Sequence, residues 1–128
     1  MPKIHYMDNG VIQAILQKRG GITGNEIESL VIAEIYKQLK TLDAQVQLYH
    51  LRTYDGKEID LLIETPECYF AFEIKMTSNV TKSCAKNIKG LEEILDKPLK
   101  RAFILSNDRV LKQFDEKTIA INVTMFLA

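Results

Sequence analysis

The sequence of 128 residues is poor in cysteine, histidine and proline and has no excess of charge of either sign. Cys68 and Cys84 are too few and too isolated for a zinc motif or a disulfide framework, so we expect two free thiols in a reducing cytosol. The 17 basic and 17 acidic side chains cancel. No global field therefore favours a polyanion, and binding to nucleic acid would need a local basic patch.

Two further signals are missing from the sequence. No apolar run approaches the roughly 20 residues that cross a bilayer, and no signal-peptide pattern is present at the start. The phosphate-binding pattern G-x-x-x-x-G-K-[ST] does not occur, so ATP binding through such a loop is not expected. We therefore expect a cytoplasmic protein that has no membrane partner and no nucleotide cofactor.

The composition is that of a globular domain, with 46% hydrophobic and 27% charged residues. A chain of this length can bury one continuous core, and no interior linker or repeat divides it, so residues 1–128 are predicted to form a single domain. Strand patterns over residues 45–52, 59–63 and 69–76 predict a three-stranded antiparallel meander. Further strands are expected at residues 3–6, 102–105 and 119–123, and helices at residues 11–17, 24–40 and 83–95. The last of these helices is expected to face inward with Ile88, Leu91, Ile94 and Leu95. This order predicts an α/β domain with a central mixed sheet flanked by helices.

The long helix predicted over residues 24–40 has one charged residue on its apolar face. Steps of 100° per residue place Glu28 in the middle of this face, whereas Glu26, Lys37 and Lys40 occupy the opposite side. A glutamate on the core side needs a partner such as a cation, a lysine or a backbone amide. The apolar face consists of Val31, Ile32, Ile35 and Leu39, with Ile27 and Tyr36 at its borders.

Three more charges lie in the hairpin formed by the second and third meander strands. Thr65-Pro66-Glu67-Cys68 fits a turn with proline at its second position, and this turn would place Asp60 opposite Glu73. Directly opposed residues share a face, which Lys75 joins two residues further on. Opposed carboxylates destabilise a sheet, and a divalent cation between them would remove that penalty. A slip of one residue would instead send Asp60 to the other face.

The first hairpin of the meander leaves two registers open. A two-residue loop, Asp55-Gly56, would place Leu51 on the face of Asp60. A three-residue loop with a bulge at Gly56 would place His50 and Arg52 there instead, and Arg52 could then contact a phosphate. Three lysines at helical spacing form a basic stripe on the helix predicted over residues 83–95 and at its start: Lys82, Lys86 and Lys89. This stripe is either a solvated surface or a set of phosphate contacts.

Glu28 on a helix, Asp60, and Glu73-Ile74-Lys75 on the third strand of a meander together resemble the PD-(D/E)XK nuclease superfamily, although Ile59 stands where the proline of that motif is usual. Nearly the whole chain is similar to an uncharacterised domain that follows the ATPase module in many prokaryotic AAA-type ATP-binding proteins. The segments that carry this second likeness are residues 2–10, 24–31, 51–52, 58–60 and 72–75.

These resemblances imply a restriction-endonuclease-like fold and a Mg²⁺ or Mn²⁺ site. Asp60 and Glu73 would be the metal ligands, with Glu28 completing the outer shell, and Lys75 would orient the attacking water and stabilise charge on the phosphate. Which group takes the proton from water stays open. The resemblance also implies that the domain could be a fragment of a longer ATPase-containing protein, with that ATPase module as a partner.

Two functions from different classes follow. The first is a metal-dependent nuclease that hydrolyses nucleic-acid phosphodiester bonds, DNA in preference to RNA, with weak or partner-assisted binding and a homodimer as a further expectation. The second is a noncatalytic regulatory or interaction domain of an AAA-type ATPase. In that case Glu73 and Lys75 would form an internal ion pair without a metal.

Overall fold

The computed structural model describes residues 3–6, 24–41 and 45–127, and the side chains of residues 28–41 and 45–127. Within these residues a seven-stranded mixed sheet has the strand order β1-β2-β3-β4-β5-β7-β6. The predicted α/β class with a mixed sheet and flanking helices is confirmed. The elements are β1 (Lys3–Tyr6), α2 (Gly24–Thr41), β2 (Gln47–Arg52), β3 (Glu58–Glu64), β4 (Tyr69–Lys75), β5 (Leu99–Ser106), β6 (Lys112–Gln113), β7 (Thr118–Asn122) and α3 (Val123–Leu127).

The sheet joins an antiparallel part to a parallel part. Strands β1, β2, β3 and β4 pair antiparallel in sequence order, so the predicted meander is present. Strand β5 then lies parallel to β4, and β7 lies parallel to β5. A parallel neighbour requires the chain to cross over one face of the sheet, and residues 76–98 make this crossing between β4 and β5.

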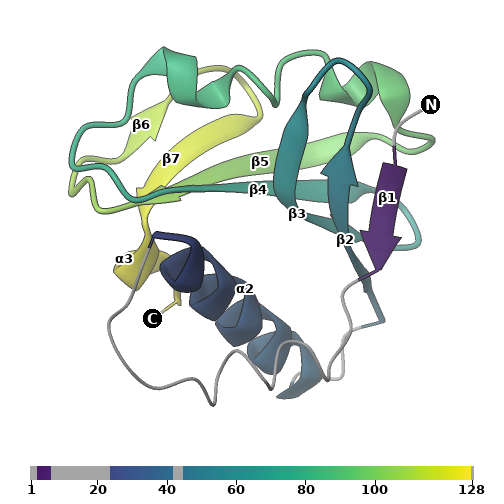
Figure 1. The fold of residues 1–128 in the computed structure, drawn as a ribbon, viewed down its shortest axis with the longest axis horizontal. Coiled ribbons are helices and arrows are strands. Elements are labelled where there is room, and N and C mark those ends of the chain that lie inside the picture. Colours follow the sequence, from purple (N-terminus) through teal and green to yellow (C-terminus); the bar gives the residue numbers. More distant parts are fainter. Residues whose placement is uncertain (1–2, 7–23, 42–44, 128) are drawn as a thin grey trace.

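The two faces of the sheet are covered differently (Figure 1). The helices α2 and α3 lie on one face, and the crossover lies on the other. The α2 face buries Val31, Ile32 and Ile35 against the sheet, as the apolar stripe predicts. On the same face Phe126 of α3 contacts the stacked rings of Phe72 and Phe103.

The crossover forms short turns in place of the predicted helix over residues 83–95, so that prediction is wrong. The 3-10 turns η1 (Lys82–Ala85) and η2 (Leu91–Ile94) are separated by Gly90, which has the left-handed φ of 77°. A left-handed residue cannot continue an α-helix, and Lys57 Nζ donates a hydrogen bond to the carbonyl of Lys89 at 3.1 Å.

Of the residues predicted to face inward in this segment, Ile88 and Leu91 are buried and Leu95 packs against the core. Ile94 is 41% exposed, so its predicted burial is wrong.

The C-terminal part of the sheet contains two elements that the sequence patterns did not predict. Strand β6 has only two residues, which is too short for an alternating pattern, and it pairs antiparallel with β7. Helix α3 begins at Val123, which the sequence pattern assigned to the last strand. The helix predicted over residues 11–17 lies outside the described residues.

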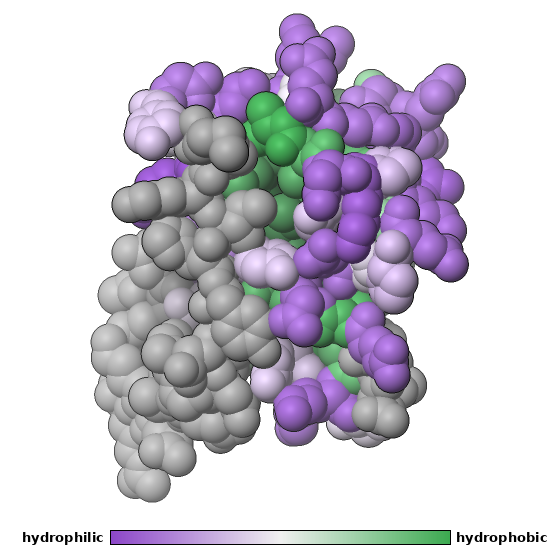
Figure 2. All heavy atoms as spheres, turned by 90° about the vertical axis from the view of Figure 1, so that its right-hand side faces the viewer, coloured by the Kyte–Doolittle hydropathy of each residue, from purple (hydrophilic) through white to green (hydrophobic). Residues whose placement is uncertain are grey.

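Figure 2 turns the molecule so that the side with β1 faces the viewer. The described side chains on this face are mainly hydrophilic, with a hydrophobic strip between them. Within residues 24–41 and 123–127, neither helix is long and apolar enough to cross a membrane.

Candidate functional site

The hairpin of β3 and β4 has the predicted register. Glu64 pairs with Tyr69, and the pairing continues to Leu61 with Phe72. The loop between them consists of residues 65–68, and the Thr65 hydroxyl holds it by accepting the N–H of Cys68 at 3.0 Å. The hairpin therefore brings Asp60 and Glu73 to the two positions that follow the last backbone pair.

At these two positions side-chain carboxylates, in place of backbone carbonyls, accept the N–H groups of the opposite strand. Glu73 Oε1 accepts the N–H of Asp60 at 3.1 Å. In return Asp60 Oδ2 accepts the N–H of Ile74 at 2.8 Å. A buried backbone N–H needs an acceptor, so each side chain satisfies a donor of the opposite strand while it holds its own carboxylate beside that strand.

A bulge in β3 lies at the same place. Tyr49 pairs with Leu62 and Leu51 pairs with Ile59, so His50 alone faces the two residues Asp60 and Leu61. An extra residue of this kind bends a strand and changes the direction of its side chains. The bulge explains why the alternation of faces along β3 is interrupted at Asp60.

The loop before β3 has three residues, which decides between the two registers left open by the sequence. The N–H of Thr53 donates to the carbonyl of Lys57 at 2.9 Å, and Gly56 has a φ of 89°. A three-residue loop that ends on a left-handed glycine is a common hairpin geometry. As this register predicts, the side chains of His50 and Arg52 meet that of Glu58 on β3. Glu58 Oε1 lies 2.8 Å from His50 Nε2 and 3.1 Å from Arg52 Nη2.

Helix α2 brings a third carboxyl group to Asp60. The pKa of Glu28 is raised to about 7, chiefly by burial and also by a side-chain hydrogen bond to Asp60 and the charges of Asp60 and Glu58, against the opposing charge of Lys75. Glu28 is half-buried. The predicted position of Glu28 on the core side of the helix is thus confirmed, with Asp60 as its partner.

Glu73 is the most deeply buried member of this group, with 2% of its surface exposed. Its pKa is raised to about 8, chiefly by burial and also by the nearby charge of Asp60, while the hydrogen bond from the Asp60 N–H and the charge of Lys75 act in the opposite direction. A carboxyl group whose pKa lies this close to neutral pH can act as an acid or a base, or can exchange its proton for a cation. We name Glu28, Asp60 and Glu73 the carboxyl cluster.

Lys75 is exposed at the end of β4 and acts on the cluster through its charge. Arg52 is exposed as well, but its guanidinium group is held by Glu58. His50 was expected near the site in one of the two open registers, whereas Glu58 was not predicted to belong to the site. The spacing of two residues between Glu58 and Asp60 on one strand is the sequence signal that could have indicated Glu58.

The donors of the cluster suit a hard cation, because Mg²⁺ and Mn²⁺ prefer carboxylate oxygen. In this structure, however, these carboxyl groups are not arranged around a common metal position. Within residues 28–41 and 45–127, no group of three or more His, Cys, Asp or Glu side chains is placed to hold a metal ion. Asp60 Oδ2 and Glu73 Oε1 each accept a backbone N–H within the hairpin, so a cation would have to share these two oxygens or bind through the other oxygen of each group.

The lysines of the predicted basic stripe lie at a different place. Lys82, Lys86 and Lys89 line a groove between the crossover and the loop that joins β6 to β7. Asp60, Glu73 and Lys75 are not among the residues that line this groove. The structure thus brings Glu28, Asp60 and Glu73 together, with the charge of Lys75 acting on them, and gathers the three lysines in a groove that the cluster does not line.

Residues 23–126 match the family model of a domain of unknown function, DUF4143. The match covers most of the chain, so the protein belongs to this family. No curated protein and no solved structure matches the chain. The family description agrees with the resemblance to an uncharacterised domain, and it names no activity, substrate or partner.

Proposed function

We propose that this domain is a metal-dependent nuclease of the PD-(D/E)XK type, with a restriction-endonuclease-like fold, and that it hydrolyses phosphodiester bonds of DNA in preference to RNA. The observation that carries the proposal is the buried Glu73, whose pKa is raised to about 8 beside Asp60. Holding carboxyl groups together in a partly desolvated place costs free energy. Such an arrangement is typical of a functional site.

The cation would be Mg²⁺ or Mn²⁺, and Glu28, Asp60 and Glu73 would hold it. When bound, it would lower the pKa of water and neutralise charge on the phosphate. Glu28 and Glu73 must give up their protons to a cation, so binding releases protons and strengthens as the pH rises. Lys75, exposed beside the cluster, would contact the phosphate and stabilise its negative charge.

Cleavage of single- and double-stranded DNA in the presence of Mg²⁺ or Mn²⁺ tests this function. We expect the wild type to cut at least one of the two, and Lys75→Ala to be slower by a factor of about 100 or more, in line with the loss of one group that stabilises transition-state charge. Lys100→Ala is the matched control, because Lys100 is an exposed lysine of β5. Equal cleavage by the wild type and Lys75→Ala would assign the activity to a contaminant.

Metal binding is measured separately by calorimetry with Mn²⁺. We expect the wild type to bind and Asp60→Ala to lose binding, whereas Glu67→Ala, an exposed residue of the β3–β4 loop, keeps it. Wild-type protein that takes up no Mn²⁺ at pH 8 would overturn the metal site.

A second function is supported by the backbone hydrogen bonds that the carboxyl cluster accepts. Asp60 and Glu73 each accept a backbone hydrogen bond from the opposite strand, which is a structural task that needs no metal. The domain would then be a noncatalytic interaction domain that binds an AAA-type ATPase module or a second copy of itself. Its signature is a double variant, Asp60→Asn with Glu73→Gln, that keeps the fold and keeps complex formation with the ATPase.

A further inference from the structure

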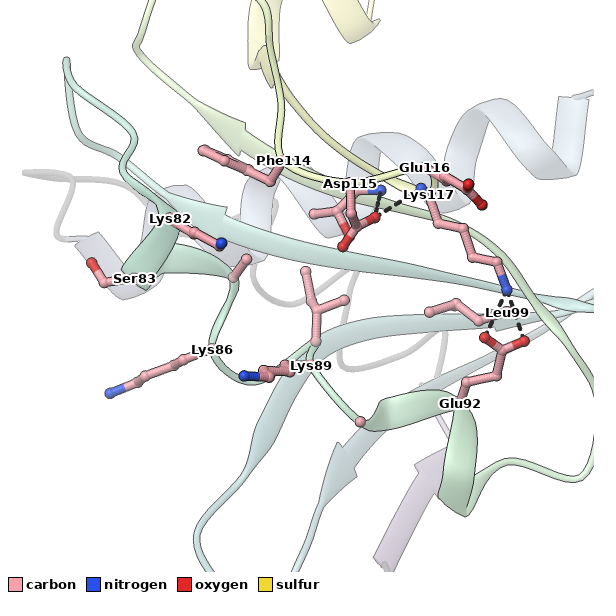
Figure 3. A pocket seen from close by; sticks show the side chains of 14 residues that line it. Lys82, Ser83, Lys86, Lys89, Glu92, Leu99, Phe114, Asp115, Glu116 and Lys117 are labelled. Atoms are coloured by element: carbon pink, nitrogen blue, oxygen red, sulfur yellow. Dashed lines mark hydrogen bonds and ion pairs between the residues drawn. The ribbon is translucent and has the colours of Figure 1, made fainter.

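The groove on the crossover face has the features of a ligand site that is separate from the carboxyl cluster. Its volume is about 860 Å³, which is within the range of roughly 300 to 1,000 Å³ that is usual for small-molecule pockets. Figure 3 shows its two walls, one from residues 82–92 of the crossover and one from residues 114–118. Leu99, at the start of β5, lies between them.

The interior surface of the groove is apolar. Ile88 and Leu99 are buried core residues, and Ala85 and Phe114 pack against the same core while they line the groove. Phe114 provides a flat aromatic surface on the wall opposite Ile88. A ligand that fills this space must therefore present an apolar and preferably flat body.

The crossover wall carries three cations without partners. In the part of the chain that the structure describes, the ammonium groups of Lys82, Lys86 and Lys89 form no hydrogen bond or ion pair, and all three side chains are exposed. Lys82 points into the space between the walls in Figure 3, whereas Lys86 extends away from it. A compact anion at this wall would gain charge-assisted contacts, since lysine binds phosphate as a point charge.

An ion pair joins the two walls of the groove at one end. Lys117 donates to both oxygens of Glu92, at 2.8 Å and 2.7 Å, and this ion pair joins the β6–β7 loop to η2. Asp115 accepts the N–H of Lys117 and of Thr118, each at 2.8 Å, and thereby fixes the loop. The groove is therefore formed before a ligand enters, which lowers the entropy cost of binding.

Acidic residues on both walls limit the length of the ligand. Glu92, Asp115 and Glu116 would repel the phosphates of a long nucleic acid that crosses the groove. A short ligand avoids them if its charge stays at the lysine wall and its apolar body covers Phe114.

We propose that this groove binds a nucleoside monophosphate, with the phosphate beside Lys82 and Lys89 and the base against Phe114. The geometry requires no phosphate-binding loop of the G-x-x-x-x-G-K-[ST] type. The proposal is independent of the nuclease function, because none of the residues of the carboxyl cluster lines the groove.

Binding of AMP, followed by ¹H–¹⁵N correlation spectra and calorimetry, tests the proposal. Adenosine lacks the phosphate and ribose 5-phosphate lacks the base, so both are expected to bind at least tenfold more weakly than AMP. The largest shifts are expected at residues 82–90 and 114–118. Equal affinity for AMP and adenosine would overturn the role of the lysines, and equal affinity for AMP and ribose 5-phosphate would overturn the role of the apolar surface.

Single variants complete the test. Lys82→Gln and Lys89→Gln should each weaken AMP binding about fivefold, the upper end of what an exposed ion pair contributes. Lys100→Gln, on β5 outside the groove, and Asp60→Asn, in the carboxyl cluster, should bind AMP as the wild type does. AMP binding that survives Lys82→Gln with Lys89→Gln, or that is lost in Asp60→Asn, would contradict the assignment. Tighter binding of single-stranded DNA than of AMP would overturn the restriction to a short ligand.

Discussion

A side-chain hydrogen bond links Glu28 of α2 to Asp60 of β3. Two carboxyl groups can share such a bond only if one of them carries a proton. With the pKa of Glu28 at about 7, this proton is present in about half of the molecules at neutral pH. This one link between the long helix and the sheet thus depends on pH near the physiological value, whereas the apolar packing of Val31, Ile32 and Ile35 does not.

The substitution Asp60→Asn should lower the pKa of both neighbouring glutamates. It removes the negative charge that helps to hold Glu73 at about 8 and Glu28 at about 7. We expect both values to fall by about one unit or more, measured by ¹³C NMR titration of the side-chain carboxyl groups. Glu67→Gln, in the β3–β4 loop at the other end of the hairpin, should leave both values unchanged. Unaltered titration in Asp60→Asn would show that burial alone sets these pKa values.

The free energy of unfolding should decrease as the pH rises from about 4.5 to 8. Glu73 has a folded pKa of about 8 and an ordinary value of 4.5, so the folded state holds its proton more tightly than the unfolded state does. The stability that this proton provides is complete below pH 4.5 and is lost as the pH passes through 8. At about 1.4 kcal/mol per pKa unit, the full loss is on the order of 5 kcal/mol.

Glu73→Gln should remove most of this pH dependence. Glutamine keeps an oxygen that accepts the Asp60 N–H, and it carries no charge at high pH. Denaturant unfolding at pH 5, 7 and 9 should show a variant that equals the wild type at pH 5 and exceeds it at pH 9. A variant that is less stable than the wild type at pH 9 would contradict the assigned ionisation.

A second carboxylate should make the protein sensitive to acid. Asp108 is 4% exposed, accepts Lys112 Nζ at 2.7 Å and accepts the N–H of Val80 at 2.9 Å. The hydrogen bond from Lys112, together with those from the N–H groups of Val110 and Val80, lowers its pKa from 3.8 to about 2. Its contribution to stability is therefore present above pH 3.8 and is lost as the pH falls to about 2. In Asp108→Asn this part of the acid transition should disappear, whereas Glu116→Gln should keep it; thermal unfolding between pH 2 and 5 measures both.

Gly90→Ala should destabilise the crossover without a clash. A Cβ at this position would lie 3.5 Å from Lys57 Nζ, an ordinary contact, but the φ of 77° is strained for any residue with a side chain. We expect a cost of about 1 kcal/mol, and a smaller one for Gly90→Asn, since asparagine tolerates the left-handed region. Gly56 has a φ of 89° and open space around it, so Gly56→Ala serves as the comparison for backbone strain alone. Denaturant unfolding that shows no loss for Gly90→Ala would indicate that the loop relaxes.

The hairpin of β3 and β4 could be predicted from the sequence because its register depends on a local turn. Pro66 fits that turn, and a loop of residues 65–68 pairs Glu64 with Tyr69 and thereby sets the register of the two strands. Glu28 could be placed for a similar reason, since the period of an α-helix decides which side of α2 it occupies. Both predictions rest on contacts that are close in sequence or regular in period.

The crossover could not be predicted in this way because its conformation depends on distant contacts. Ile88 and Leu91 are three residues apart, a spacing that fits both an α-helix and a 3-10 turn. The left-handed Gly90 and the bond from Lys57 to Lys89 decide between them, and Lys57 lies on another hairpin. The bulge at Asp60 also depends on pairing, because it arises where β2 and β3 fall out of step.

The exchange of hydrogen bonds between Asp60 and Glu73 has a consequence for reading related sequences. A chain that had lost all chemistry at this site would still need a side-chain acceptor at both positions, or two N–H groups of the sheet would be left without one. Asparagine and glutamine would serve that need as well as the acids do. In a relative of this domain, an oxygen acceptor at these two positions therefore indicates the hairpin structure alone. Only the acids Asp and Glu, in place of their amides, indicate that the negative charge is still used.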